Sequence, residues 1–311
     1  MKICFVGLGS IGTRHLRNLT ILLNKRDISY SIDALRSSNR PLDANIIRLL
    51  NKQFTDIENL PNDYDVAFIC TPTSNHYDDI RRMANHSRHM FIEKPVFDTV
   101  RNGVVLSPRQ DSIYYVACPL RYTAVLQYLK ENIQADSVYA VRAICSTYLP
   151  DWRAGLDYRT VYSAHRSMGG GVEIDLIHEW DYICWLFGMP KRVQCAYGQY
   201  SDLELDSDDL ALYIGEYADK IVSLHLDYFG RNERREIELY TKDETVVGDI
   251  RNGEVRFLKK ASVVKLSESR DHYQIIELDH FLDILEGKCN NDNSIKHAED
   301  VLAVAKGEWK V

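Results

Sequence analysis

A glycine pattern near the start of the chain constrains its fold more than any other feature. Residues 7–12 read Gly-Leu-Gly-Ser-Ile-Gly and match the pattern G-x-G-x-x-G. An apolar run, Lys2–Val6, precedes them, and a stretch with leucines at helical spacing, Arg14–Asn24, follows. A strand, a glycine turn and a helix in this order are typical of the phosphate-binding turn of dinucleotide-binding domains. An ordinary glycine turn, or a domain that has lost its ligand, is the alternative.

Each glycine of this pattern has a physical role in such a turn. Gly7 permits the tight turn, Gly9 carries no Cβ that would block a pyrophosphate, and Gly12 lets the helix pack closely on the strand. The first backbone N–H groups of the helix, around Ser10 and Ile11, have no intrahelical partner and lie at the positive end of its dipole. We therefore predict that these five residues bind the diphosphate of a dinucleotide.

The remaining periodicity divides the chain into two predicted parts. Strands and helices alternate as far as Cys118, which is typical of a parallel sheet covered on both faces. From Pro119 onward several short strands follow one another and predict an antiparallel sheet, and one long helix is expected over Glu173–Phe187. The fold class is thus α/β, with a Rossmann-type, doubly wound parallel sheet over residues 1–118 and a second α/β domain over residues 119–311.

Composition and charge disfavour several classes of protein. The net charge of −7 argues against nucleic acid or an anionic membrane as the main partner. No apolar run approaches the roughly 20 residues that span a bilayer, and the first residues carry no cleavage-site pattern of a secretory signal. The seven cysteines are scattered, odd in number and never spaced as C-x-x-C. These features predict a cytoplasmic protein with reduced thiols.

The end of the second predicted strand bears on which dinucleotide is bound. An acidic residue there binds the 2′-hydroxyl of NAD, whereas arginine and small hydroxyls accommodate the 2′-phosphate of NADP. Asp33 lies near the spacing of an NAD-type acid, 21 residues after Gly12. Apolar alternation, however, continues the strand beyond Asp33, so that Arg36 and Ser37 stand at its tip. We predict NADP, bound by Arg36 and Ser37, with NAD as the alternative.

Three further polar clusters follow predicted strands or open the long helix. Residues 71–76 read T-P-T-S-N-H after an apolar strand, and residues 93–95 read E-K-P after the next one. Residues 169–181 read G-G-G-V-E-I-D-L-I-H-E-W-D at the start of the helix. Because ligands of doubly wound folds bind at the carboxyl ends of strands, we expect these clusters around the ligand.

In this order and at these distances, the motifs resemble the glucose-fructose oxidoreductase / inositol dehydrogenase family, also called the Gfo/Idh/MocA oxidoreductases. The resemblance covers essentially the whole chain, and its motifs extend from the glycine loop, with the following His15, to the glycine-rich segment at mid-chain. It implies an N-terminal Rossmann domain and a C-terminal α/β domain with an open, largely antiparallel sheet, often used for oligomerisation. It also implies reversible hydride transfer at a carbohydrate carbon.

The resemblance implies roles for individual residues. Lys94 matches the family's active-site lysine, which hydrogen-bonds the reacting oxygen, and His178 matches its catalytic histidine, a general acid/base. Asp175 matches the acid that holds the substrate or orients the base. Pro95 is expected to set an extended backbone that aims Lys94 into the cleft. The strand-end residues assigned to the cofactor are Thr71, Pro72, His76, Glu93 and Lys94.

The sequence departs from the family pattern at the catalytic pair. Asp175 and His178 are three residues apart, whereas relatives such as inositol dehydrogenase have the pair four apart. Both spacings place two side chains on one face of a helix. Asp175, His178 and Asp181 form a polar stripe on an otherwise apolar helix, and buried ionisable groups are costly unless paired or functional. Which of Asp175, Glu179 and Asp181 partners His178 stays open, and a purely structural ladder is the alternative.

An aromatic and basic segment before this helix, residues 148–166, is the predicted substrate-binding region. Aromatic faces stack on sugar rings, and arginines bind phosphate or carboxylate. A surface loop or a subunit interface is the alternative for this segment. Arg121 matches a position where the family often has an aromatic or basic residue beside the nicotinamide. The residues predicted to bind substrate are Arg121, Trp152, Arg153, Tyr158, Tyr162, Asp175 and His178.

Together these features predict an NADP- or NAD-dependent dehydrogenase or reductase. Its substrate would be a sugar, sugar nucleotide or polyol, in surface-carbohydrate biosynthesis, and the chain would form a dimer or tetramer. No metal is expected, because the chain has no H-E-x-x-H and no cysteine pair. Two alternatives are a nicotinamide-dependent glycoside-cleaving enzyme, which leaves NADPH unchanged overall, and a non-catalytic dinucleotide- or sugar-binding regulator. Retention of both Lys94 and His178 argues against the regulator.

Overall fold

Two compact units make up the chain in this computed structural model, which describes residues 1–37, 40–101 and 111–310. The first unit comprises Met1–Ala117 and Gln274–Glu299, and the second comprises Cys118–Tyr273 and Asp300–Val311. The first change of unit thus falls at Cys118. The predicted division, made of two consecutive stretches, does not include the return of the chain to the first unit near its end.

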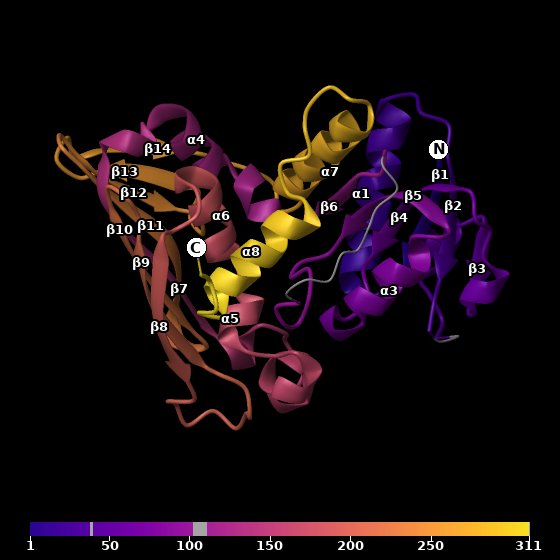
Figure 1. Cartoon of the computed structure of the whole chain (residues 1–311), viewed down its shortest axis with the longest axis horizontal. Coiled ribbons are helices and arrows are strands. Elements are labelled where there is room, and N and C mark those ends of the chain that lie inside the picture. Colours follow the sequence, from indigo (N-terminus) through magenta and orange to yellow (C-terminus); the bar gives the residue numbers. More distant parts are fainter. Residues whose placement is uncertain (38–39, 102–110, 311) are drawn as a thin grey trace. The chain divides into compact units, whose positions relative to one another are not determined.

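A six-stranded parallel sheet forms the first unit, with the strand order β3-β2-β1-β4-β5-β6 (Figure 1). This confirms the predicted doubly wound sheet. The order reverses between β1 and β4, and ligands of such sheets bind outside the carboxyl ends of the strands at this switch point. The strands are β1 (Lys2–Val6), β2 (Ser31–Leu35), β3 (Lys52–Phe54), β4 (Tyr64–Ile69), β5 (Ser87–Ile92) and β6 (Tyr114–Val116).

Apolar packing explains why the late segment belongs to the first unit. Helices α1 (Ser10–Lys25) and α3 (His76–Met83) pack beside β1 and β4. Phe281, on helix α7 (His272–Leu285), lies edge-on to Phe68 and Phe91, with ring centroids 6.1 Å and 5.3 Å apart. Edge-to-face contacts at these distances are favourable, so the sheet's aromatic core holds α7 in this unit.

An eight-stranded sheet forms the second unit, with the order β14-β13-β12-β11-β7-β10-β9-β8. Its neighbours are antiparallel except β7 and β10, so the predicted largely antiparallel sheet is confirmed. Neither β14 nor the short β3 of the first unit was expected. The strands are β7 (Val138–Tyr148), β8 (Arg192–Gly198), β9 (Leu210–Glu216), β10 (Ile221–Asp227), β11 (Phe229–Thr241), β12 (Thr245–Asp249), β13 (Glu254–Phe257) and β14 (Ser262–Lys265).

Helices cover one face of this second sheet (Figure 1). The long helix predicted over Glu173–Phe187 is wrong, because Leu176 leaves helical geometry with φ −98° and ψ 26°. Asp175 therefore ends one helix and His178 begins the next. The helices here are α4 (Ala124–Asn132), α5 (Val172–Asp175) and α6 (His178–Phe187), and the other described α-helices are α2 (Ala44–Ile47) and α8 (Ile295–Ala305). Within the described ranges, no helix has the length and hydropathy that a membrane span requires.

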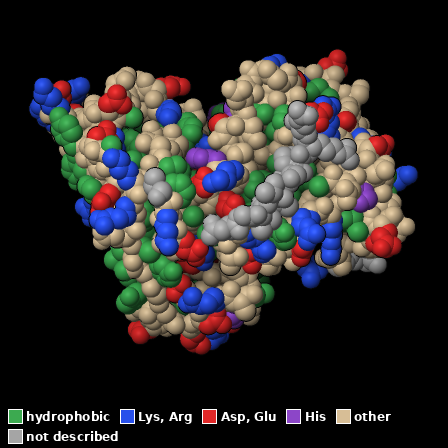
Figure 2. Space-filling view, in the orientation of Figure 1, with side chains coloured by type: hydrophobic (Ala, Val, Ile, Leu, Met, Phe, Trp, Pro, Cys, Tyr) green, Lys and Arg blue, Asp and Glu red, His purple; other side chains and the backbone are tan. Residues whose placement is uncertain are grey.

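The opposite face of the second sheet exposes apolar side chains. Along β9, alternate residues are buried, whereas Leu212 and Ile214 are exposed, and Ile221 opens β10 in the same way. Successive strand residues point to opposite faces, so these three side chains lie on the face away from the helices. Figure 2 shows hydrophobic side chains gathered over the strands β8–β10.

Candidate functional site

The glycine loop leads directly from β1 into α1 in the first unit. Gly7 has a φ of +89°, which favours glycine, and a Cβ on Gly12 would lie only 2.4 Å from the carbonyl oxygen of Gly7. The turn therefore requires glycine at both positions. A Cβ on Gly9 would meet no atom within 4 Å, so the space beside this residue is open.

The start of α1 suits an anionic ligand beside that open space. The cap residue, Gly9, offers no side-chain hydrogen bond to the first turn, and the first turn has no acidic residue. The N–H groups that begin at Ser10 and Ile11 are thus available at the positive end of the helix dipole. The loop therefore fits a dinucleotide diphosphate.

Asp33 and Arg36 have different positions at the end of β2. Asp33 lies inside the strand, is buried, and accepts a 2.8 Å hydrogen bond from the hydroxyl of Tyr64. Arg36 follows the last strand residue and donates from Nη1 to Gln53 at 2.9 Å. Ser37, next to it, is exposed. The strand thus continues past Asp33, and Arg36 and Ser37 stand at its tip.

A buried histidine joins the two motifs that follow β4 and β5. His76 has one ring nitrogen 2.9 Å from the carbonyl oxygen of Thr71 and the other 3.0 Å from that of Pro95. Burial lowers the pKa of His76, despite these carbonyls. His76 therefore ties the T-P-x-x-x-H turn to the E-K-P segment, whose Lys94–Pro95 peptide is cis. Lys94 itself is partly exposed.

Glu93 is held by the histidine that follows the glycine loop. Its carboxylate contacts Nε2 of buried His15 and accepts a 3.2 Å hydrogen bond from the backbone N–H of Lys94. Burial alone would raise the pKa of Glu93, but the hydrogen bond and charge of His15 bring it below its usual value. Glu93 was predicted to bind cofactor, and its contacts connect helix α1 to the Lys94 segment.

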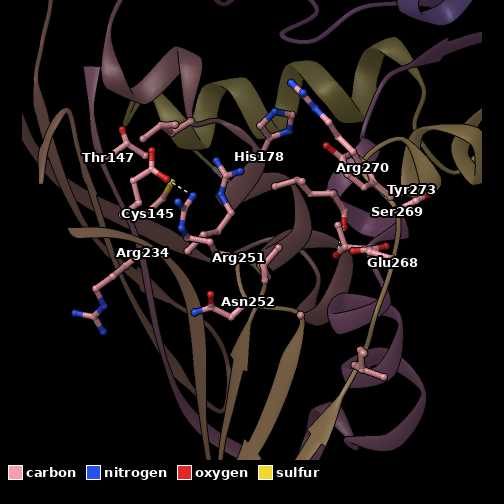
Figure 3. A pocket seen from close by; sticks show the side chains of 18 of the residues that line it. Cys145, Thr147, His178, Arg234, Arg251, Asn252, Glu268, Ser269, Arg270 and Tyr273 are labelled. Atoms are coloured by element: carbon pink, nitrogen blue, oxygen red, sulfur yellow. Dashed lines mark hydrogen bonds and ion pairs between the residues drawn. The ribbon is translucent and has the colours of Figure 1, made fainter. Parts of the chain in front are cut away.

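The second unit contains a cavity of about 890 Å³, seen in Figure 3. Trp152, Asp175 and His178 line it, and all three were predicted to bind substrate. Its walls come from β7, from the β11–β12 region and from the segment after β14. A volume of this size is typical of small-molecule sites.

Asp175 is positioned by a buried tyrosine at this cavity. The hydroxyl of Tyr228 donates to Oδ2 of Asp175 at 2.6 Å. Trp152 lies edge-on to the Tyr228 ring, with centroids 5.3 Å apart, so one cavity residue supports another through Tyr228. Burial and the charge of Asp175 raise the pKa of Tyr228 well above its usual value, so its hydroxyl stays a donor.

The two other carboxylates considered as partners of His178 form ion pairs with arginines. Glu179 is buried and lies 2.8 Å from Nε of Arg235. Asp181 accepts two hydrogen bonds from buried Arg121, at 2.9 Å and 2.6 Å. A buried bidentate pair of this kind holds α6 to the segment before α4. Arg121, predicted to bind substrate, does not line the cavity.

The aromatic and basic segment forms a series of short 3₁₀ turns beside the cavity residue Trp152. Arg153 and Tyr158 line a separate small hollow with Trp152. The hydroxyl of Tyr158 accepts a 3.0 Å hydrogen bond from the backbone N–H of Glu204. Burial and the charge of Asp175 raise the pKa of Tyr162. Of the residues predicted in this segment, only Trp152 lines the main cavity.

Sequence reasoning missed most of the charged residues that line the cavity. They lie on β11, after β12, and at or after the end of β14. The alternation of residues along these strands gives no indication of function. One available signal is the polar stretch 267–271, S-E-S-R-D, because loops at strand ends commonly carry binding residues. The unpredicted charged side chains are Glu233, Arg234, Arg235, Arg251, Lys265, Glu268 and Arg270.

Family comparisons match both units. Residues 1–107 match the profile of an oxidoreductase family with an NAD-binding Rossmann fold, GFO_IDH_MocA. Residues 126–260 match the GFO/IDH/MocA C-terminal domain. The chain belongs to the GFO/IDH/MocA oxidoreductase family. This confirms the resemblance found in the motifs.

Curated relatives of this GFO/IDH/MocA protein match it in part. Myo-inositol 2-dehydrogenase from Thermotoga maritima is 26% identical over 199 residues, which are 60% of this chain and 55% of the relative. An uncharacterized oxidoreductase from Bacillus subtilis is 24% identical over 189 residues, 59% of this chain and 52% of the relative. The matches thus span about half the length of these relatives.

Solved structures match over nearly the whole chain at low identity. UDP-N-acetylglucosamine 3-dehydrogenase from Acidithiobacillus ferrooxidans has a TM-score of 0.77 at 18% identity, covering 99% of this chain and 96% of that one. Levoglucosan dehydrogenase, in complex with NADH and levoglucosan, has a TM-score of 0.81 at 16% identity, covering 99% and 95%. These similarities establish the fold of the GFO/IDH/MocA protein.

Proposed function

We propose that this chain is an NADP-dependent oxidoreductase that moves a hydride to or from a CH–OH carbon of a sugar, sugar nucleotide or polyol. The observation that carries the proposal is the cavity of the second unit, where His178, Asp175 and Trp152 combine an acid/base group, a carboxylate and an aromatic face. The relatives named above as sugar or inositol dehydrogenases support the same substrate class. A role in surface-carbohydrate biosynthesis stays a prediction.

The two units supply different groups to the proposed reaction. The nicotinamide, when bound, supplies the hydride acceptor or donor. Lys94 donates a hydrogen bond to the reacting oxygen, and His178 takes the hydroxyl proton during oxidation and returns it during reduction. Asp175, fixed by Tyr228, binds a substrate hydroxyl or orients His178. The diphosphate binds to the glycine loop, at Gly7, Gly9, Ser10, Ile11 and Gly12. The segments that follow β4 and β5 bind the cofactor beside this loop, through Thr71, Pro72, His76 and Glu93.

NADP is the proposed cofactor, because Asp33 and Arg36 differ in their positions at the end of β2. The carboxylate of Asp33 is buried inside β2 and already bonded to Tyr64, which leaves it poorly suited to a ribose hydroxyl. Arg36 and Ser37 at the strand tip offer a guanidinium and a hydroxyl to a 2′-phosphate. The test is the ratio of kcat/KM for NADP⁺ and NAD⁺, and a strong preference for NAD⁺ would overturn this assignment.

An assay that follows NADPH and analyses the products in parallel distinguishes the proposed reaction from its alternatives. Sugars, polyols and sugar nucleotides are screened with NADP⁺ by absorbance at 340 nm, with products analysed in parallel. Net NADPH formation supports the oxidoreductase; cleaved products without net NADPH support glycoside cleavage; binding without turnover supports a regulator. His178→Ala should abolish most turnover, whereas the matched variant His225→Ala, on the exposed side of β10 and outside the cavity, should not.

The exposed apolar face of the second sheet is the proposed surface for self-association. Leu212, Ile214 and Ile221 lie on this face, and large exposed apolar patches commonly mark protein–protein contacts. We propose a dimer or tetramer formed through it. Light scattering after size-exclusion chromatography tests this, since Leu212→Lys should reduce the measured mass to that of the monomer.

A further inference from the structure

In the cavity of the second unit, every arginine and lysine of the lining but one forms an ion pair with a carboxylate. Four of its five arginine and lysine side chains pair with carboxylates: Arg234 with Glu236, Arg235 with Glu179, Arg251 with Glu233 and Lys265 with Glu254. Among the arginines and lysines of the lining that the structure describes, Arg270 is the one without an ion pair to a carboxylate. The cavity therefore holds one uncompensated guanidinium.

Arg270 is directed toward the proposed catalytic histidine. It follows β14, in the segment that contributes consecutive lining residues from Lys265 to Arg270. Figure 3 shows its side chain extending toward the part of the cavity where the ring of His178 lies. Glu268, two residues before Arg270, accepts a 3.3 Å hydrogen bond from the backbone N–H of Ala124 at the start of α4. That carboxylate is thus engaged with another element.

We propose that Arg270 binds a carboxylate or phosphate group of the substrate, so that the substrate is an anionic sugar. This rests on the proposed function, because it takes the cavity as the sugar site. A guanidinium presents parallel N–H donors that match the oxygens of either group, and such charge-assisted bonds are roughly twice as strong as neutral ones. In a chain of net charge −7, a basic side chain left unpaired in a cavity is complementary to an anion.

In this proposal, two groups of lining residues recognise two different parts of the anionic substrate. His178, Asp175 and Trp152 face the sugar carbon and ring, while Arg270, with the hydroxyl of Ser269 beside it in sequence, faces the anionic group. A neutral sugar would leave the guanidinium without a partner in the complex. Loss of a hydrogen bond to a charged group lowers affinity about 10- to 150-fold.

Sugars that share the same ring but differ in charge test the inference, in one set of three compounds and one pair. Glucose, glucuronate and glucose 6-phosphate are compared as substrates with NADP⁺, and N-acetylglucosamine is compared with UDP-N-acetylglucosamine. We expect kcat/KM to be at least about tenfold higher for a charged member than for its neutral counterpart. Preference for glucuronate identifies a carboxylate, and preference for either phosphorylated compound identifies a phosphate.

Arg270→Gln should raise the KM for the preferred anionic sugar about 10- to 100-fold and leave the KM for the neutral sugar unchanged. Arg270→Lys should recover part of the loss, because it restores the charge without the two parallel donors. Arg192→Gln is the matched control, since Arg192 pairs with Glu216 on the β8–β9 edge, outside the cavity. Equal effects of Arg270→Gln on charged and neutral sugars would overturn the inference while leaving the proposed function intact.

Thermal shift separates failure of the inference from failure of the proposed function. If no compound is oxidised, an anionic sugar that raises the Tm of the wild-type protein but not of Arg270→Gln still supports the anion site. The proposed reaction would then be the part that fails. If none of the charged sugars is oxidised or raises the Tm, the anion site is overturned.

Discussion

The two units position their candidate functional residues by different means. In the first unit, Gly9, Arg36, Thr71 and Lys94 each follow a strand of one parallel sheet, so the strand order brings them to one edge. The side-chain contacts of His76 and Glu93 add to this arrangement. In the second unit, contacts between side chains far apart in sequence do this work; Tyr228 reaches Asp175 across 53 residues. Strand order therefore suffices to locate one set, whereas the other depends on individual buried polar contacts.

The largest expected effect tests whether the two units serve one reaction. Lys94→Ala and His178→Ala should each lower kcat about 10²- to 10⁴-fold, because each removes a proton-transfer or hydrogen-bonding group from the proposed step. If both act on the same transition state, the double variant should lose little more than the worse single variant. Steady-state kinetics with NADP⁺ and an identified substrate measure this, with circular dichroism as the control for folding. Losses that multiply would indicate independent roles.

A smaller effect is expected on stability when the His15–Glu93 contact is broken in the first unit. The folded state holds the pKa of Glu93 below its usual value, so the ionised carboxylate stabilises the fold above the unfolded pKa, about 4.3. This stabilisation is lost as the pH falls through the folded pKa. Glu93→Gln should lower the free energy of unfolding by about 3 kcal/mol at pH 7 and by progressively less below pH 4.

Urea unfolding at pH 7 and pH 3.5 provides the measurement for Glu93→Gln. Glu58→Gln, at an exposed position of the same unit, is the control and should change neither value. A loss that is equal at both pH values would mean that the contact acts through packing rather than through charge.

More of the first unit than of the second could be predicted from the sequence, for a physical reason. The glycine loop, the strand that continues past Asp33, and the E-K-P turn could all be predicted, because each depends on local periodicity and on the order of parallel strands. The interruption at Leu176 was not predicted, since an apolar helical pattern continues through it. Neither were the Arg121–Asp181 and Glu179–Arg235 pairs, because nothing local encodes which distant arginine meets which carboxylate.

Tyr228→Phe tests the dependence of the second unit on one buried contact. It removes the hydroxyl that donates to Asp175 and should lower stability by about 2 kcal/mol, and kcat roughly tenfold if Asp175 is then misplaced. Tyr182→Phe is a close control, because the hydroxyl of Tyr182 is buried in the same unit and has no hydrogen-bond partner among the described residues. Equal effects of the two variants on kcat would remove the positioning role.

The smallest expected effect concerns Arg36, where topology rather than a polar network fixes the position. Arg36 stands at the tip of β2 because the strand continues past Asp33, and its backbone N–H donates to the carbonyl of Phe54 on β3 at 2.9 Å. Arg36→Ala keeps that backbone bond and removes only the guanidinium, so the fold should be unaffected. The kcat/KM for NADP⁺ should fall about tenfold, since one charge-assisted contact is lost, while that for NAD⁺ should stay constant. The NAD⁺ value is thus an internal control measured on the same preparation. A parallel fall with both cofactors would mean that Arg36 supports the strand tip itself, so that the tip of β2 would depend on a side-chain contact and not on strand order alone.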